Sequence, residues 1–292
     1  MATVTAGREG GAFAPSDRLG QRDFQRLARF IQDYSGIRMP DSKITMLEGR
    51  LRSRVRANGR VDLADYCRYL FDEGGLEPET IHLIDAVSTN KTEFFREPEH
   101  FRILASRVLP SLIEKQGAAR RAAVKVWSAA ASTGAEPYTL AMVLDDFELH
   151  FPGFSSTILA TDICTEVLQI AVRGIYPASM MAPVPPHMRE RYVRASRDRA
   201  KDLARVIPRL RARVQFGRLN LMDSSYPVDR DIDVIFCRNI LIYFEKPTQE
   251  AVTRRLCDHL RPGGYLFLGH SETLNGFNLP LRSLGATLFQ RI

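Results

Sequence analysis

The chain of 292 residues has few of the residue types and spacings that build disulfide frameworks, zinc sites or membrane spans. Its four cysteines, Cys67, Cys164, Cys237 and Cys257, include no CxxC pair, and its six histidines form no HxxxH spacing. We therefore expect reduced thiols, a cytoplasmic location and no bound metal. No run of 18 apolar residues is present, so no transmembrane helix is predicted. Residues 1–19 lack the apolar stretch of a signal peptide, and we expect them to form a flexible tail.

The common phosphate-binding loops are also missing, since neither GxGxxG nor GxxxxGK[ST] occurs in the sequence. Such loops present backbone N–H groups at a helix N-terminus to the phosphates of a nucleotide. Their absence argues against a dinucleotide cofactor and against a nucleoside triphosphate.

The chain is long enough for about two domains, and its 45% hydrophobic and 26% charged residues are typical of globular proteins. Residues 20–89 show helical periodicity. Four helices are predicted over 22–36, between Pro40-Asp41 and Asn58-Gly59, over 61–73 and over 78–88. Because the helices and their links are short, we predict a small all-α N-terminal domain over 20–89.

After about residue 97 the pattern changes to strands that alternate with helices. Strands are predicted at 124–130, 156–163, 214–220, 232–239 and 263–270, with helices at 137–149, 166–174 and 248–260. Nearly continuous apolar strands in this order predict an α/β fold with a doubly wound parallel sheet, which residues 286–292 could close as an antiparallel edge strand. We place this domain at 98–292, after a linker at 90–97. Ligands of such sheets bind beyond the carboxyl ends of the strands.

Two acids lie at those strand ends and restrict the kind of ligand. The first strand is followed by small residues at 131–134 that let a backbone approach a ligand closely, with Gly134 permitting a tight turn, and then by Glu136. Glu136 would repel a pyrophosphate and suits a cationic ligand, unless it is only a helix N-terminal acid favoured by the helix dipole. Asp162 follows the second strand, where an acid accepts hydrogen bonds from ribose hydroxyls. A cationic cofactor with a ribose and no phosphate indicates S-adenosylmethionine.

The motifs SAAASTGAEPYTLA, ATDI, STNKTEFFRE, NLM at 220–222, IFCRNILIYF and GGYLFLGHSE occur in this order along the chain. Together they resemble the CheR family of chemotaxis receptor glutamate O-methyltransferases, from about residue 20 to the C-terminus. The resemblance implies a Rossmann-like methyltransferase domain with a small inserted β-subdomain at about 176–213. A small all-α domain precedes it in the sequence. It implies S-adenosylmethionine as cofactor and glutamates on the cytoplasmic helices of chemoreceptors as acceptors, in adaptation of chemotaxis signalling. The cofactor contacts that it implies are Asn90, Thr92, Arg96, Glu136, Asp162, Asn220, Leu221, Arg238 and Asn239. One departure is Ala135, where the family commonly has a second acid.

Methyl transfer to a carboxylate requires alignment more than proton transfer. A glutamate with a pKa near 4.3 is already ionised at neutral pH, so no general base is needed. We expect Arg96 and Tyr243 to hold the acceptor carboxylate, Arg96 through paired N–H donors. Alternatively, Arg96 pairs with Glu93 or Glu97, and Tyr243 is a half-buried aromatic whose hydroxyl has a backbone partner. For the segment 270–272 we expect a loop that shapes the pocket and has no chemical role.

The chain has a net charge of +7, and the excess is concentrated. Residues 189–213 contain ten Lys or Arg against three acids, a local charge of +7 that equals the total. Arginines also flank the second predicted helix, with Arg50 and Arg54 on one side and Arg52 and Arg56 on the other. Both regions could bind an acidic receptor surface. The alternative is that these arginines are solvated on the protein surface and bind no partner, which would give the same sequence pattern. In some CheR proteins the inserted subdomain docks a receptor pentapeptide at a glycine-rich turn; RASRDRAKDLARVIP has no glycine, so we expect no pentapeptide docking here.

Two other functions remain to be weighed. A nucleic-acid methyltransferase that modifies a base amino group would carry an Asn/Asp-Pro-Pro-aromatic sequence after the fourth strand, where this chain has RNIL. The basic segment also lacks interleaved aromatics other than Tyr192, so no nucleic-acid partner is expected. A non-enzymatic regulatory module with this fold stays open, although each cofactor position is intact. We expect a monomer that does not insert into membranes.

Overall fold

The computed structural model describes residues 18–116, 123–198 and 200–292. Most of the predicted flexible tail and Arg199 of the basic segment lie outside the described residues. Leu19, at the end of that predicted tail, is buried, and its N–H donates to Glu48 at 2.9 Å. The chain divides into two compact units, a helical unit of residues 18–32 and 39–87 and an α/β unit of residues 33–38 and 88–292. The short segment 33–38 therefore packs with the α/β unit, although the sequence pattern placed it inside the helical domain.

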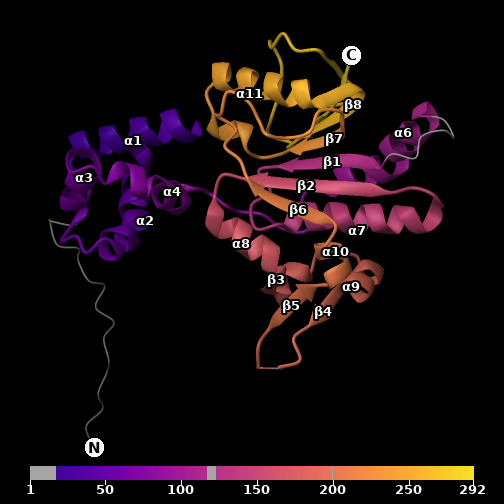
Figure 1. Ribbon diagram of the computed structural model, residues 1–292, viewed down its shortest axis with the longest axis horizontal. Coiled ribbons are helices and arrows are strands. Elements are labelled where there is room, and N and C mark those ends of the chain that lie inside the picture. Colours follow the sequence, from indigo (N-terminus) through magenta and orange to yellow (C-terminus); the bar gives the residue numbers. More distant parts are fainter. Residues whose placement is uncertain (1–17, 117–122, 199) are drawn as a thin grey trace, which may run out of the picture. The chain divides into compact units, whose positions relative to one another are not determined.

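Four helices form the helical unit, as predicted, and Figure 1 labels them. They are α1 (Gln21–Ser35), α2 (Ile44–Ala57), α3 (Leu63–Asp72) and α4 (Leu76–Val87), with a 3₁₀ turn, η2 (Asp41–Lys43), before α2. Helix α4 begins two residues before Pro78, where its predicted range starts. On α1 and α2, Leu27, Ile31, Leu47 and Leu51 are fully buried, because side chains at i, i+3 and i+4 share one helix face.

A buried carboxylate joins three of these helices. Glu79 of α4 is 3% exposed. It accepts hydrogen bonds from Arg54 Nε at 2.6 Å, Tyr66 Oη at 2.9 Å and Asn58 Nδ2 at 3.0 Å. Arg50 donates to the carbonyl of Val87 at the end of α4. Of the two predicted basic flanks of α2, the Arg50/Arg54 flank therefore stabilises the unit from within.

A seven-stranded sheet in the order β6-β2-β1-β7-β8-β10-β9 forms the centre of the α/β unit (Figure 1). Its strands are β1 (Val124–Ala129), β2 (Ser156–Asp162), β6 (Val214–Arg218), β7 (Ile232–Cys237), β8 (Leu260–Leu268), β9 (Leu281–Ser283) and β10 (Leu288–Arg291). The first five pair in parallel, whereas β10 is antiparallel to both β8 and β9. The predicted doubly wound sheet with an antiparallel C-terminal strand is confirmed. Strand β10 does not form the edge that we expected, because β9, a strand that the sequence pattern did not indicate, pairs with its outer side.

Helices cover both faces of this sheet, because successive side chains of a strand point to opposite faces. Val126 belongs to the apolar core on one face and its neighbour Trp127 to the core on the other. The first core contains residues of α7 (Ala135–His150), and the second contains residues of α11 (Lys246–His259). Helix α8 (Thr165–Arg173) follows β2. These three helices were predicted. The helical run of α5 (Glu99–Ile103), a π-helical turn η3 (Leu104–Val108) and α6 (Leu109–Gln116) was not.

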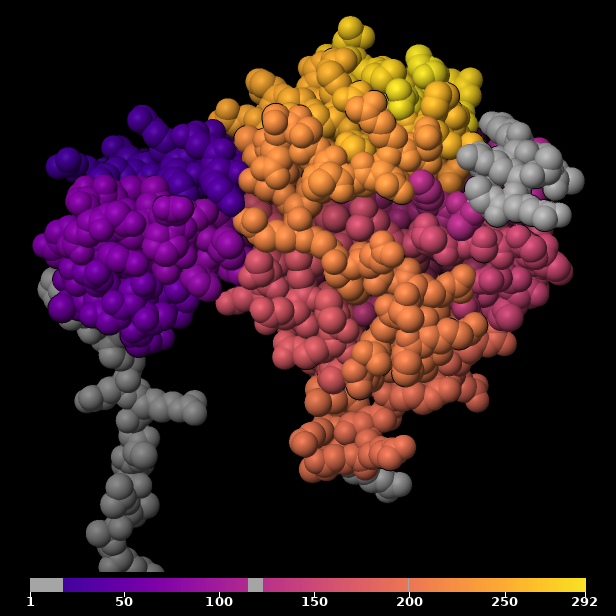
Figure 2. All heavy atoms as spheres, in the orientation of Figure 1, coloured from indigo at the N-terminus to yellow at the C-terminus, as the bar shows by residue number. Residues whose placement is uncertain are grey.

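The insertion between α8 and β6 contains a three-stranded antiparallel sheet in the order β3-β5-β4, which confirms the predicted β-subdomain. Its elements are β3 (Ile175–Pro177), η4 (Ala178–Met181), α9 (Pro186–Tyr192), β4 (Val193–Ala195), β5 (Leu203–Val206) and α10 (Pro208–Arg211). In Figures 1 and 2 the β4–β5 hairpin protrudes from the body of the α/β unit. Asp145 of α7, only 1% exposed, pairs with Arg209 at 2.7 Å and Arg213 at 2.5 Å and so attaches the insertion to the sheet domain.

Among the described residues, no helix has both the length and the apolar content that crossing a membrane requires.

Candidate active site

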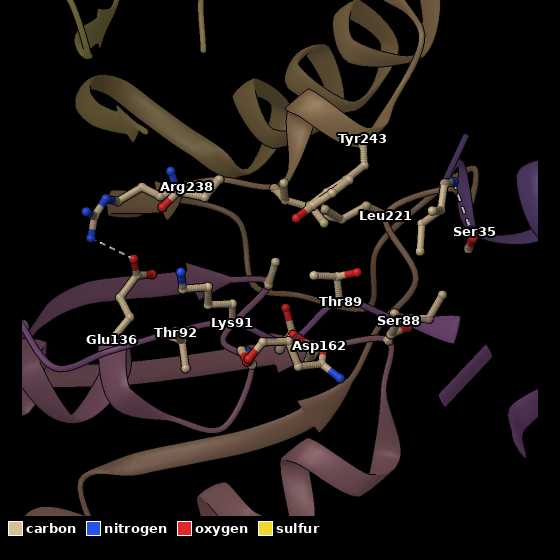
Figure 3. A pocket seen from close by; sticks show the side chains of 18 of the residues that line it. Ser35, Ser88, Thr89, Lys91, Thr92, Glu136, Asp162, Leu221, Arg238 and Tyr243 are labelled. Carbon is tan, nitrogen blue, oxygen red and sulfur yellow. Dashed lines mark hydrogen bonds and ion pairs between the residues drawn. The ribbon is translucent and has the colours of Figure 1, made fainter. Parts of the chain in front are cut away.

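One cavity of the α/β unit is lined by all ten residues predicted for the site. They are Asn90, Thr92, Arg96, Glu136, Asp162, Asn220, Leu221, Arg238, Asn239 and Tyr243. The cavity lies at the carboxyl ends of β1, β2, β6 and β7, where a doubly wound sheet binds its ligand. Figure 3 shows Glu136, Thr92, Lys91 and Asp162 on one side of it and Arg238, Leu221 and Tyr243 on the other.

The turn after β1 is held to the end of β2 by Asp162. Its Oδ2 accepts from the backbone N–H of Ser132 at 2.8 Å, and its Oδ1 accepts from that of Cys164 at 2.9 Å. Both bonds come from the protein backbone, so the carboxylate also shapes the turn that lines the cavity. Asp162 is 7% exposed.

Gly134 forms the tight turn that we expected and also packs closely against α8. Its φ of 92° confirms the tight turn that the sequence suggested, since L-residues with a side chain rarely adopt such an angle. A Cβ at this position would lie 2.8 Å from Cβ of Ala171 on α8. The missing side chain therefore permits close packing of the turn against a helix rather than the approach of a ligand.

Arg238, directly after β7, joins both sides of the cavity. Its Nη1 donates to Glu136 Oε2 at 3.0 Å, the dashed contact in Figure 3. Its Nη2 donates to Glu97 Oε2 at 2.9 Å and to the carbonyl of Arg96 at 2.5 Å. The side chain is 1% exposed and packs against the ring of Phe101. Arg238 therefore positions two acids and the linker at once.

The pKa values of Glu136 and Glu97 are shifted in opposite directions, because burial and pairing act with different weight on the two acids. Burial raises the pKa of Glu136, although Arg238 and the hydroxyl of Ser128, which donates at 2.8 Å, both oppose this. Burial would also raise the pKa of Glu97, but hydrogen bonds from Arg238 and Asn239 outweigh it and lower the pKa to about 2. Glu97 is therefore fully ionised at neutral pH. From the sequence, Glu97 is expected only as a possible ion-pair partner of Arg96.

Glu272 fixes the loop that follows Arg238. Its carboxylate accepts four backbone hydrogen bonds, from Asn239 at 2.9 Å, Ile240 at 2.8 Å, Leu241 at 2.7 Å and Gly269 at 2.6 Å. Asn239 has a φ of 60°, a left-handed conformation that a short polar side chain tolerates. The loop leads into the 3₁₀ turn η5 (Leu241–Tyr243). We expected a pocket-shaping loop over 270–272, and Glu272 does this with a buried charge.

The segment 33–38 forms another part of the cavity wall, through Ser35 and Ile37. Asn220 Nδ2 donates to the carbonyl of Tyr34 at 2.6 Å, and Asn220 Oδ1 accepts from the N–H of Met222 at 3.0 Å. The side-chain amide of this predicted cofactor residue is thus bonded to the chain itself. Gly36 has a φ of 75°, and a Cβ there would lie 2.8 Å from Met222 Sδ.

The two residues predicted to bind the acceptor carboxylate, Arg96 and Tyr243, both line the cavity. Arg96 is half-buried, and its Nη1 donates to the carbonyl of Lys91 at 3.1 Å. The alternative was an ion pair of Arg96 with Glu93 or Glu97, and Glu97 pairs with Arg238. Tyr243 is half-buried, and its backbone carbonyl accepts from the N–H of Arg38 at 3.1 Å. In Figure 3 its hydroxyl points into the cavity.

The sheet order, the antiparallel β10–β9 edge and a cavity with an acid at the end of β2 define the class of S-adenosylmethionine-dependent methyltransferases. Family models agree. Residues 90–289 match the CheR methyltransferase SAM binding domain, and residues 22–88 match the CheR methyltransferase all-alpha domain. The chain therefore belongs to the CheR methyltransferase family, as its motifs predicted, and S-adenosylmethionine is its cofactor.

Relatives of known function match nearly the whole chain. The chemotaxis protein methyltransferase of Salmonella typhimurium is 38% identical over 93% of this chain and 90% of its own length. The chemotaxis protein methyltransferase of Escherichia coli is 37% identical over 94% of this chain and 93% of its own length. That of Borreliella burgdorferi is 36% identical over 87% of this chain and 89% of its own length. Among solved structures, a TehB-like SAM-dependent methyltransferase from Corynebacterium glutamicum covers 67% of this chain and 94% of its own, at 12% identity and a TM-score of 0.36. That score is too low to carry an argument.

Proposed function

We propose that this enzyme transfers the methyl group of S-adenosylmethionine to glutamate side chains on the cytoplasmic helices of chemoreceptors, forming methyl esters and S-adenosylhomocysteine. The observation that carries this proposal is a single cavity lined by an acid at the end of β2, the Arg238–Glu136 pair, and Arg96 and Tyr243 beside them. The 33–38% identity to chemotaxis protein methyltransferases supports the acceptor class. The enzyme acts in the cytoplasm as a monomer.

The cofactor contacts are divided between the strand ends and the linker 90–97. Asp162 accepts hydrogen bonds from the ribose hydroxyls, because its carboxylate lies at the end of β2, where that contact is made in doubly wound sheets. Glu136 and Arg238 form an ion pair of opposite charges that suits the methionine ammonium and carboxylate. Asn90, Thr92 and Arg96 approach from the linker, and Asn220, Leu221 and Asn239 from the other strand ends.

Arg96 and Tyr243 hold the acceptor carboxylate. A guanidinium presents two parallel N–H donors to a carboxylate. The Tyr243 hydroxyl, which points into the cavity in Figure 3, adds a third donor. The reaction is an in-line displacement in which the carboxylate oxygen forms a bond to the methyl carbon as the carbon–sulfur bond breaks. Both reactants are already charged for this step, so the protein supplies alignment and excludes water.

Residues 20–89 recognise the receptor, and the inserted subdomain at about 176–213 contributes positive charge without docking a terminal pentapeptide. The turn between β4 and β5 contains no glycine, which supports this. Arg209 and Arg213 are paired with Asp145, so the contribution to an acidic receptor surface comes from exposed residues such as Arg189 and Arg197. Receptor affinity then falls as salt rises. Micromolar binding of an aromatic-ended pentapeptide in a calorimetric titration would contradict the docking part alone.

Radiolabelled methyl transfer tests the function. The purified enzyme and labelled S-adenosylmethionine are incubated with chemoreceptor membranes, with receptor whose glutamates are replaced by alanine, and with nucleic acid. We expect base-labile label on the unmodified receptor and none on the other two acceptors. Label on nucleic acid, or label that resists mild base, would reject a glutamate methyl ester.

A further inference from the structure

A Glu–His–His cluster lies beside the Arg238 pocket and is not used by the proposed methyl transfer. It consists of Glu97, His100 and His270, and one ligand atom from each lies within 4.8 Å of the others. Glu97 and His100 are three residues apart, and the N–H of His100 donates to the carbonyl of Glu97 at 3.1 Å. His270 follows β8, 173 residues further along the chain. The sequence predicted no metal site because metal ligands were sought by their spacing, and spacing does not reveal this cluster.

We propose that Glu97, His100 and His270 form a site for a divalent transition metal that accepts mixed nitrogen and oxygen ligands, such as Zn²⁺. Glu97 Oε2 lies 3.4 Å from His100 Nδ1. Two zinc bonds of about 2.05 Å that meet at the tetrahedral angle hold their donor atoms about 3.4 Å apart. Glu97 Oε2 lies 4.0 Å from His270 Nε2, and a small rotation of that exposed ring closes the difference.

The lone pairs that such a metal requires are present. His100 is 1% exposed, and its Nδ1 has no hydrogen-bond partner among the described residues although it faces a carboxylate oxygen. Its other ring nitrogen, Nε2, lies 2.7 Å from the hydroxyl of Thr287. A hydrogen bond to the second nitrogen is the usual way in which a metal-binding histidine is oriented. The second oxygen of Glu97 is held in the same manner by Asn239 Nδ2 at 3.1 Å.

The metal would act as an inhibitor rather than as a resident cofactor. His270 has 58% of its side chain exposed, which gives a path from solvent. Glu97 Oε2 also accepts from Arg238 at 2.9 Å, so a bound cation and the guanidinium compete for one oxygen. Displacement of Arg238 would disturb its pairing with Glu136, and through it the cofactor pocket. This coupling rests on the proposed function of the pocket, whereas metal binding itself does not.

Calorimetric titration of the full chain with ZnCl₂, without cofactor, tests the site. We expect one Zn²⁺ per chain with a micromolar Kd, and at least about tenfold weaker binding for His270→Ala. His187→Ala is the matched control, because His187 is exposed and lies outside the cluster, and its affinity for Zn²⁺ should equal that of the unchanged chain. Binding that is absent at millimolar Zn²⁺, or equal in the two variants, overturns the proposal.

A second titration tests whether Zn²⁺ bound at this site weakens the binding of S-adenosylhomocysteine. S-adenosylhomocysteine should bind the unchanged chain several-fold more weakly in saturating Zn²⁺, and should bind His270→Ala equally with and without Zn²⁺. Equal affinity with and without Zn²⁺ in the unchanged chain overturns the inhibitory coupling. Failure of S-adenosylhomocysteine to bind in the absence of Zn²⁺ would instead contradict the proposed function.

Discussion

The amide of Asn220 donates from Nδ2 to the backbone carbonyl of Tyr34 at 2.6 Å. This bond connects the segment after β6 to residues 33–38, which extend from the end of α1. Because Ser35 and Ile37 line the same cavity as Asn220, the wall of the cofactor pocket includes residues from the first fifth of the chain. Asn220 therefore holds this segment against the end of β6.

Replacement of Gly36 by alanine should therefore weaken cofactor binding as well as stability. The new Cβ would lie 2.8 Å from Met222 Sδ and from the ring of Phe244, with φ at 75°. Gly59→Ala is a matched control, since Gly59 has a φ of 62° and no atom within 4 Å of a built Cβ. Both variants should lose about 1–2 kcal/mol to backbone strain. We expect only Gly36→Ala to bind S-adenosylhomocysteine at least about tenfold more weakly, by calorimetry. Equal affinities in the two variants would exclude a role of the segment in the pocket.

Asp162→Ala should weaken S-adenosylhomocysteine binding by at least about tenfold, because hydrogen bonds to a charged group contribute about 1.5–3 kcal/mol each. Part of the loss will arise within the protein, since the carboxylate also accepts from Ser132 and Cys164. Asp162→Asn keeps one acceptor oxygen and should lose less. Calorimetry gives the Kd, and far-ultraviolet circular dichroism checks the fold. If the alanine variant binds as tightly as the unchanged chain, the ribose contact has been assigned to the wrong residue.

Arg96 and Glu136 should differ in which kinetic parameter they control. Arg96→Ala should lower kcat by about 10- to 100-fold and change the Kd of S-adenosylhomocysteine little, because its guanidinium aligns the acceptor. Glu136→Ala should mainly weaken cofactor binding, because it removes the partner that Arg238 contacts at 3.0 Å. Single-turnover methyl transfer and calorimetry separate the two effects. A large loss of product affinity in both variants would restrict Arg96 to the cofactor.

Glu272→Gln should reduce methyl transfer although Glu272 contacts neither reactant. In the unchanged chain four backbone N–H groups donate to the Glu272 carboxylate. In the variant the amide nitrogen of glutamine cannot accept from these donors, so the loop that contains Asn239 and Tyr243 would shift. A misplacement of about 1 Å costs on the order of a hundredfold in rate. Glu245→Gln, at an exposed position before α11, is the control. Lower thermal stability with unchanged kcat and KM would assign Glu272 a purely structural role.

Glu79 should make the stability of the helical unit sensitive to acid. Burial raises its pKa, but the hydrogen bonds from Arg54 and Tyr66 outweigh burial, and the pKa in the folded chain is lowered. The unfolded chain therefore binds the proton first, so this contribution is complete above about pH 4.3 and is lost as the pH falls below it. Glu79→Gln should cost about 3 kcal/mol at pH 7 and flatten this acid dependence. Glu73→Gln, which removes an exposed pair, should cost at most about 1 kcal/mol. Equal losses in denaturant titrations of the two variants would refute the difference.

The sequence predicted most elements because their signals are local. Nearly continuous apolar runs locate the strands, patterns of period 3.6 locate the helices, and small residues before Glu136 locate the turn after β1. The sequence did not reveal that residues 33–38 pack with the α/β unit, because a helix end followed by a glycine looks like an ordinary link. Its second role appears only in long-range contacts, such as the hydrogen bond from Asn220 to Tyr34 and the position of Gly36 beside Met222 and Phe244, some 200 residues away.

The missed residues of the site are acids whose partners are distant in the chain. Glu97 was compared with Arg96, its neighbour, but its partner is Arg238, 141 residues away. Glu272 lies in the motif GGYLFLGHSE and in the expected pocket-shaping loop, but the sequence does not reveal its partners, because they are backbone N–H groups that any sequence provides. A charge was therefore easy to find in the sequence, whereas the group that neutralises it was not.

The contacts of Arg238 also limit how this enzyme can change over evolutionary time. One guanidinium bonds to Glu136, to Glu97 and to the carbonyl of Arg96, so a substitution at position 238 leaves two carboxylates without their cation. No single second substitution repairs both losses. We expect natural variants to retain Arg238, Glu136 and Glu97 together. Neighbouring residues that line the cavity without pairing to these charges can be substituted more freely and can adapt the enzyme to new receptors.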